Sequence, residues 1–276
     1  MVCPDCNRGS ILPGTPTGSI VKVHGLDAYF APAPSPSEID NSSVAVVVLP
    51  DAFGLTLVNT KLIADILAKD LACDVWVPDL FNGGEPLLRV DGMEVQLIPD
   101  RPGRTSLWDT LRLYLVLIPR MGIIIRNRPS VVDARIKSFI KTIREENGYS
   151  KIGGVGYCFG GGVAARLAAN PNDLDSVVIC HPALISLASA KNAKSPTSWV
   201  CAEEDSSFPR DMRLKAEAIL VKRKDKDDSV SYEFIDYKGT VHGFANRPNL
   251  ALEEVKAAFE QSLMQTKAWL RKTLEI

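Results

Sequence analysis

A single cysteine stands between glycines at residues 156–160, where the chain reads Gly-Tyr-Cys-Phe-Gly. A short apolar run, 152–155, precedes this pentapeptide, and a helix-like stretch, 163–169, follows it. The G-x-C-x-G pattern is typical of a sharp strand-to-helix turn that raises a nucleophile above a sheet edge. Glycine on both sides removes side chains that would collide across the turn. The pattern therefore predicts a strand that runs directly into a helix, with Cys158 between them.

Cys158 is a candidate nucleophile because it would lie at a helix N-terminus, where the helix dipole favours a thiolate. The alternative is a buried core position, which is the usual fate of a free cysteine. Cys73, Cys180 and Cys201 fit that alternative, since none of them has flanking glycines of this kind. Glycines would be unnecessary around a core cysteine, so the pattern favours a catalytic Cys158.

Apolar runs and amphipathic stretches alternate along the chain. The strand-like runs are 44–49, 74–78, 152–155, 176–180, 196–201 and 231–237. The helix-like stretches are 59–71, 129–146, 163–169, 211–224 and 250–274. Continuous apolar strands that alternate with helices predict an α/β fold, with a doubly wound, mostly parallel sheet and helices on both faces.

We expect one domain over residues 1–276. Residues 1–18 are rich in Gly, Pro and Thr and predict an extended arm, and 19–30 predicts a pair of edge strands with a turn at His24-Gly25. Residues 82–128 do not fit the alternation of strands and helices. An insertion of that length, containing an apolar stretch, predicts a helical lid.

A thiol nucleophile needs a base within hydrogen-bonding reach and a group that orients the base. In this architecture the acid and the histidine follow the nucleophile in that order, each after a later strand. His242 follows the last strand-like run and Asp205 follows the run before it. Glu203 and Glu204 share the Asp205 loop, but the short Asp205 carboxylate next to a Ser-Ser-Phe-Pro turn is favoured.

Two other histidines compete with His242. His181 precedes the acidic loop and so breaks the expected order, and His24 lies in the predicted hairpin turn. His242 is therefore the candidate base. The alternative for the acidic loop is a solvated segment that caps the following helix.

Acyl transfer also requires donors for the developing oxyanion. The sequence predicts the N–H of Phe159, directly after the nucleophile, and the N–H of Ala52, in the loop after the 44–49 strand. Asp51 would place a carboxylate beside the thiol, or it could be a turn or N-cap residue.

Composition limits the possible partners. The net charge is −1, which gives no indication of a nucleic-acid or anionic-membrane partner. No apolar leader opens the chain, and six cysteines without one favour the reducing cytoplasm. Cys3 and Cys6 form a C-x-x-C motif, which alone does not define a zinc or redox site. We therefore expect a small-molecule substrate, neither nucleic acid nor a membrane as partner, and a monomer or homodimer.

The chain resembles the dienelactone hydrolase (carboxymethylenebutenolidase) family of the α/β-hydrolase fold. The segments that carry the resemblance are 50–54, 77–81, 156–161, 204–209 and 242–244. The N-terminal segments 3–6 and 14–18 are similar to those of fungal-type members.

The resemblance implies a Cys158–His242–Asp205 triad that opens an ester or lactone through an acyl-thioester, with no metal or organic cofactor. It also implies that Asp51 occupies the position of an acid that helps to generate the thiolate. Arg247 stands one residue from the position of an arginine that binds a substrate carboxylate.

The expected function is thiol-dependent hydrolysis of a small-molecule ester or lactone. The apolar stretch 108–125 raises an alternative, an isomerase, cyclase or decarboxylase that acts on a polyketide-like metabolite. A binding protein with a vestigial site is a third possibility.

Overall fold

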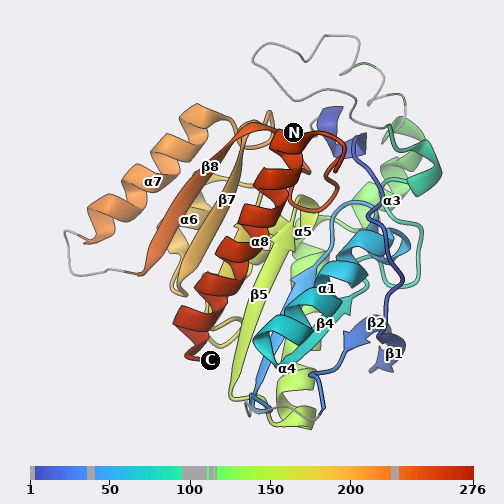
Figure 1. Ribbon diagram of the computed structural model, residues 1–276, viewed down its shortest axis with the longest axis vertical. Helices are drawn as coiled ribbons and strands as arrows, with labels where there is room; N and C mark the ends of the chain where they lie inside the picture. Colours follow the sequence, from blue (N-terminus) through green and yellow to red (C-terminus); the bar gives the residue numbers. More distant parts are fainter. Residues whose placement is uncertain (1–3, 36–40, 95–110, 112–114, 116, 225–229) are drawn as a thin grey trace.

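A computed structural model describes residues 4–35, 41–94, 111, 115, 117–224 and 230–276 (Figure 1). The strands are β1 (Ser19–Val23), β2 (Leu26–Ala31), β3 (Val44–Leu49), β4 (Asp74–Pro78), β5 (Lys151–Tyr157), β6 (Ser176–Cys180), β7 (Thr197–Glu204) and β8 (Tyr232–Val241). The α-helices are α1 (Val58–Leu71), α3 (Met121–Arg126), α4 (Pro129–Asn147), α5 (Phe159–Leu167), α6 (Leu187–Asn192), α7 (Arg210–Lys224) and α8 (Glu253–Leu274). Short 3-10 turns are η1 (Pro4–Asn7), η2 (Gly54–Thr56), η3 (Val90–Gly92) and η4 (Ile118–Arg120).

The strands form one eight-stranded sheet in the order β1-β2-β4-β3-β5-β6-β7-β8. β1 pairs with β2, and β2 with β4, in antiparallel register, whereas the pairs from β4 through β8 are parallel. The structure confirms the predicted mostly parallel, doubly wound sheet. Because β3, β5, β6, β7 and β8 run in the same direction, their carboxyl ends meet at one edge, where the loops can build a site.

Helices cover both faces of the sheet. α1 and α8 pack on one face, while α4 and α5 pack on the other, with α6 beside α5 and α7 on α6 (Figure 1). All six residues of β3 are buried, which explains why its sequence is a continuous apolar run rather than an alternating one. Among the described residues, no helix is both long and apolar enough to cross a membrane.

The predicted edge strands and hairpin turn are confirmed, since His24 and Gly25 both have positive φ between β1 and β2. The helix after Cys158 begins at Phe159, earlier than the predicted residue 163. Three consecutive glycines disfavour a helix by propensity. Here they are required because β-carbons on Gly160 and Gly162 would collide with backbone oxygens of neighbouring loops.

The predicted arm, 1–18, and the predicted lid, 82–128, both contain short helical elements. The N-terminal arm contains the turn η1, and Arg8 forms an isolated parallel bridge with Glu94. The predicted lid 82–128 lies partly outside the described residues, and so does Trp108. Its described helical elements are η3, η4 and α3. In Figure 1 these elements lie near η1, at the end of the sheet where the site loops are.

Candidate active site

Cys158 occupies a strained turn between β5 and α5. Its backbone has φ 52° and ψ −111°, a conformation that residues other than glycine rarely adopt. The Cys158 N–H donates to the carbonyl oxygen of Cys180 at 3.1 Å, and its own carbonyl accepts from the Ala183 N–H at 2.8 Å. Hydrogen bonds on both sides therefore hold the strained residue in place.

His242 and Asp205 come together at the carboxyl ends of β8 and β7. The His242 Nδ1 lies 2.9 Å from Asp205 Oδ2, and both side chains are buried. Asp205 Oδ1 accepts from the N–H groups of Ser207 and Phe208 at 2.8 and 3.2 Å. Because the loop backbone holds one carboxylate oxygen, the other is fixed toward the imidazole.

The other candidates for acid and base lie in different environments. Glu203 accepts a hydrogen bond from the N–H of Gly239 at 2.8 Å. His181 is fully buried, and its ring centroid lies 5.1 Å from that of His242. Neither His181 ring nitrogen has a hydrogen-bond partner in the described part of the chain. Burial lowers the pKa of His181 well below its ordinary value, and the charge of His242 adds to that effect, so a neutral His181 packs against His242.

The thiol and the imidazole form a charge pair. A hydrogen bond with Cys6 lowers the pKa of Cys158 well below its ordinary value against the effect of burial, and the charges of His242 and Arg247 act in the same direction. Burial works to lower the pKa of His242, but the charges of Asp205 and Cys158 outweigh it, and this pKa is raised well above its ordinary value. The two directions favour a thiolate beside an imidazolium.

The two predicted oxyanion donors lie next to the thiol. Ala52 and Phe159 both line the cavity that contains Cys158. The neighbouring N–H groups are already engaged, since Phe53 donates to the Asp51 carboxylate and Gly160 donates to the Pro50 carbonyl. Both predicted residues thus line the cavity of the thiol, and their role as oxyanion donors stays a prediction.

The side chains of Asp51 and Arg247 face each other, and neither residue lines the cavity. Their side chains are fully buried and form an ion pair, and Asn246 donates a hydrogen bond to the same Asp51 oxygen at 2.8 Å. Burial raises the pKa of Asp51, while the charge of Arg247 acts against this rise. For Arg247, burial works to lower the pKa, but the Asp51 carboxylate outweighs it, so the guanidinium keeps its proton.

Arg247 also connects the N-terminal arm to the site. Its guanidinium donates to the backbone oxygens of Arg8 and Cys6 at 3.0 and 3.2 Å. These bonds position Cys6, whose Sγ lies 3.9 Å from Cys158 Sγ. Sequence reasoning missed this thiol because the C-x-x-C motif pointed to Cys3 as its neighbour, and Cys3 lies outside the described residues.

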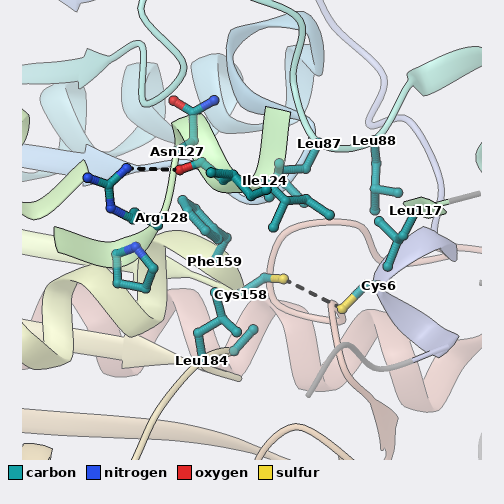
Figure 2. A pocket seen from close by; sticks show the side chains of 14 residues that line it. Cys6, Leu87, Leu88, Leu117, Ile124, Asn127, Arg128, Cys158, Phe159 and Leu184 are labelled. Carbon is teal, nitrogen blue, oxygen red and sulfur yellow. Dashed lines mark hydrogen bonds between the residues drawn. The ribbon is translucent and has the colours of Figure 1, made fainter. Parts of the chain in front are cut away.

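A cavity of about 310 Å³ opens onto the thiol, and its lining is largely apolar (Figure 2). The residues that line it are Cys6, Ala52, Leu87, Leu88, Leu117, Ile124, Ile125, Asn127, Arg128, Pro129, Cys158, Phe159, Ala183 and Leu184. Several come from the predicted lid segment, which therefore forms the wall opposite the nucleophile. The cavity can accept a small, mostly apolar molecule.

A cysteine at the turn between a central parallel strand and its helix, with an acid and a histidine after the last two strands, defines an α/β-hydrolase. The model of the Dienelactone hydrolase family matches residues 26–274. The chain therefore belongs to the dienelactone hydrolase family, and it is a hydrolase of the class that acts on carboxylic ester or lactone bonds.

Similar proteins include fungal and animal chains. Hydrolase pyvD of Aspergillus violaceofuscus is 30% identical over 270 residues, which cover 98% of this chain and 96% of pyvD. The carboxymethylenebutenolidase homolog of Homo sapiens is 27% identical, covering 89% of this chain and 86% of its own. Among solved structures, the dienelactone hydrolase-like promiscuous phosphotriesterase P91, from metagenomic libraries, has a TM-score of 0.55 at 20% identity and covers 93% of this chain and 98% of its own. The likeness to that structure supports the fold.

The charge pair predicts an unusual pH profile for alkylation of Cys158. An ordinary thiol has a pKa of about 8.5 and loses reactivity as the pH falls below it. Because the pKa of Cys158 is lowered, iodoacetamide should modify it at an undiminished rate through neutral pH, and the rate should fall only as the pH drops through the lowered pKa. Peptide mass spectrometry at several pH values measures this rate for the Cys158 peptide.

In His242→Ala the midpoint of that profile should move to higher pH, because the imidazolium is gone. A wild-type midpoint near that of an ordinary thiol would contradict the charge pair.

The buried ion pair predicts a large loss of stability in Arg247→Met. This substitution leaves the Asp51 carboxylate buried without its partner, and breaking one side of a buried pair typically lowers the free energy of unfolding by about 3–5 kcal/mol. Lys22→Met is the matched control, since Lys22 pairs with Asp27 at the surface and should change stability by less than about 1 kcal/mol. Urea denaturation of both variants measures the difference, and equal losses would contradict the structural role of Arg247.

Proposed function

We propose that this protein hydrolyses a small, mostly apolar carboxylic ester or lactone through an acyl-thioester on Cys158. The observation that carries the proposal is the placement of Cys158 at the wall of an apolar cavity, within 4.8 Å of the His242 imidazole that Asp205 orients. Family membership favours hydrolysis over the isomerase, cyclase or decarboxylase alternative.

The first half of the reaction forms the thioester. The Cys158 thiolate attacks the carbonyl carbon, and the negative charge moves to the carbonyl oxygen. The N–H groups of Ala52 and Phe159, two residues that line the cavity, are the proposed donors to that oxyanion. When the tetrahedral intermediate collapses, the imidazolium of His242 gives its proton to the leaving alkoxide.

The second half releases the acid. His242, now neutral, accepts a proton from a water molecule as the water attacks the thioester carbonyl. That proton makes His242 an imidazolium again, and collapse of the intermediate expels the Cys158 thiolate and releases the carboxylic acid. Asp205 keeps the ring in one orientation through both halves, because its second oxygen is held by backbone N–H groups.

The cavity lining is largely apolar, which favours an uncharged acyl group. Asn127 and Arg128 are polar residues in the lining, each donates a hydrogen bond to a backbone oxygen of α3, and the charged Arg128 is exposed to solvent. Arg247, the candidate for binding a substrate carboxylate, is 1% exposed and paired with Asp51. A substrate carboxylate would have to break that ion pair, so we propose a neutral substrate.

Asp51 and Arg247 then act on the thiol rather than on the substrate. The positive charge of Arg247 contributes to the lowered pKa of Cys158, and Asp51 holds that charge in position. We propose the reducing cytoplasm as the compartment, because the thiol must remain reduced and Cys73, Cys158, Cys180 and Cys201 form no disulfide in the described part of the chain.

The triad predicts how three substitutions change turnover of a neutral test ester, 4-nitrophenyl butyrate. Cys158→Ala should abolish the thioester route, and His242→Ala should lower kcat by at least about 1,000-fold. Asp205→Asn should also lower kcat, because a neutral amide stabilises the imidazolium less and can donate its N–H to Nδ1, which favours the wrong tautomer. Steady-state kinetics with folded variants, verified by circular dichroism, measure these effects.

Cys201→Ala is the control, since Cys201 is a core cysteine of the same sheet and should leave kcat unchanged. The same assay with 4-nitrophenyl hemisuccinate tests the substrate class, and we expect kcat/KM at least about tenfold lower for this charged ester. Full activity of Cys158→Ala would overturn the proposed mechanism, and equal activity on both esters would overturn the neutral substrate.

A further inference from the structure

A second thiol lies against the nucleophile, and thioester chemistry does not require it. Cys6 comes from η1, at the far end of the chain from Cys158, and both side chains are buried. Figure 2 shows the two side chains, both in the cavity lining, with their sulfur atoms pointing toward each other. The distance between the two Sγ atoms is 3.9 Å. Arg247 fixes this approach through its bond to the Cys6 carbonyl.

The His242 imidazole completes a cluster of three donor atoms. The Sγ atoms of Cys6 and Cys158 and a ring nitrogen of His242 all lie within 4.8 Å of one another. His242 is 1% exposed, and its Nε2 has no hydrogen-bond partner in the described ranges of the chain. Its Nδ1 is bonded to Asp205. In zinc sites the ligating histidine commonly has this arrangement, with the second ring nitrogen on a carboxylate.

The spacing of the two sulfurs fits a tetrahedral metal centre. A Zn–S bond of about 2.3 Å places two thiolates of a tetrahedral site about 3.8 Å apart. The observed separation of 3.9 Å, between two sulfurs joined by a hydrogen bond and by no covalent bond, is nearly the same. Two cysteines and one histidine are a known ligand set for zinc, and such a set leaves a fourth position open. Here Cys6 and Cys158 both line the cavity, so a metal held between them would be next to it.

We propose that Cys6, Cys158 and His242 form a zinc site that holds this enzyme in a reversibly inactive state. Binding gives two Zn–S bonds and one Zn–N bond, and two protons leave, one from the Cys6 thiol and one from the Cys158–His242 pair. Two thiolates balance the charge of Zn²⁺, which suits a cavity with apolar walls.

The inactive state rests on the proposed function, because it assumes that Cys158 is the nucleophile. In the complex, the electron pair of the thiolate is bonded to zinc and cannot attack a carbonyl. His242 is bonded through the nitrogen that would carry the catalytic proton. The binding of metal does not depend on that assumption, so metal binding and turnover can be measured separately.

Cobalt titration tests the site without an activity readout. The full-length, reduced protein is titrated with Co²⁺, whose bond to a thiolate gives a charge-transfer absorption, and Zn²⁺ is then added. We expect one Co²⁺ per chain and its displacement by Zn²⁺. Cys6→Ser should weaken the metal by at least about 100-fold, and Asp205→Asn, which keeps all three ligands, by about 10–100-fold.

Cys73→Ser is the matched control, because Cys73 is a buried thiol in the core on the other face of the sheet, and its variant should bind Co²⁺ like the wild type. Absence of the thiolate absorption in the wild-type protein would overturn the proposal. Equal Co²⁺ affinity of Cys6→Ser and wild type would also overturn it.

A second experiment measures how Zn²⁺ affects turnover of a neutral ester. Zn²⁺ should inhibit the wild-type protein, a chelator should restore activity, and Cys6→Ser should need at least about 100-fold more Zn²⁺ for the same fractional inhibition. Unchanged turnover at saturating Zn²⁺ would overturn the inactive state. A protein that binds Co²⁺ but cleaves no ester would contradict the hydrolase proposal and support the metal site.

Discussion

The ion pair between Arg247 and Asp51 joins the three segments on which the site depends. Asp51 belongs to the loop after β3, and Arg247 belongs to the loop after β8. The same guanidinium binds the backbone of the N-terminal arm at Arg8 and Cys6. Because the charges are fully buried, neither can be lost without leaving the other unpaired in the interior. The pair therefore fixes the loop that holds Ala52, the loop that holds His242, and the second thiol relative to one another.

The strained backbone of Cys158 depends on the close packing of β3, β5 and α5. A positive φ at a cysteine is unfavourable by about 1–3 kcal/mol and persists only where the surroundings impose it. β3 lies beside β5 and α5 packs against both, so close that a β-carbon at Gly160 would collide with the carbonyl oxygens of Leu49 and Pro50. The absence of a β-carbon at Gly160 thus allows the sharp turn, and Cys158 in this turn lines the cavity.

Much of this arrangement could be predicted from sequence. The continuous apolar run of β3, the glycines around Cys158 and the order of acid and histidine are local patterns, and each has a direct physical cause. They placed Cys158, Asp205 and His242 at one edge of a parallel sheet, and the structure brings them together. The sequence also favoured Asp205 over Glu203 and Glu204, because Asp205 directly precedes a turn whose backbone N–H groups can hold a short carboxylate.

The remaining features depend on contacts that no local pattern encodes. The pairing of Asp51 with Arg247 joins residues 196 positions apart, and the approach of Cys6 to Cys158 joins residues 152 apart. A spacing rule applied to Cys6 points to Cys3, and no local pattern indicates that the fold also brings Cys158 beside Cys6. Similarly, Arg247 could be recognised as a candidate for binding a substrate carboxylate, but its burial is determined by the packing of the arm over the site.

The central claim is that Cys158 carries the acyl group during turnover. The direct measurement is rapid acid quenching of the wild-type protein during hydrolysis of a slowly deacylated ester, followed by peptide mass spectrometry. The account predicts a mass increase equal to the acyl group on the peptide that contains Cys158, reversed by hydroxylamine, which cleaves thioesters. Consumption of the ester with an unmodified Cys158 peptide, or an acyl group on another residue that persists in Cys158→Ala, would contradict it.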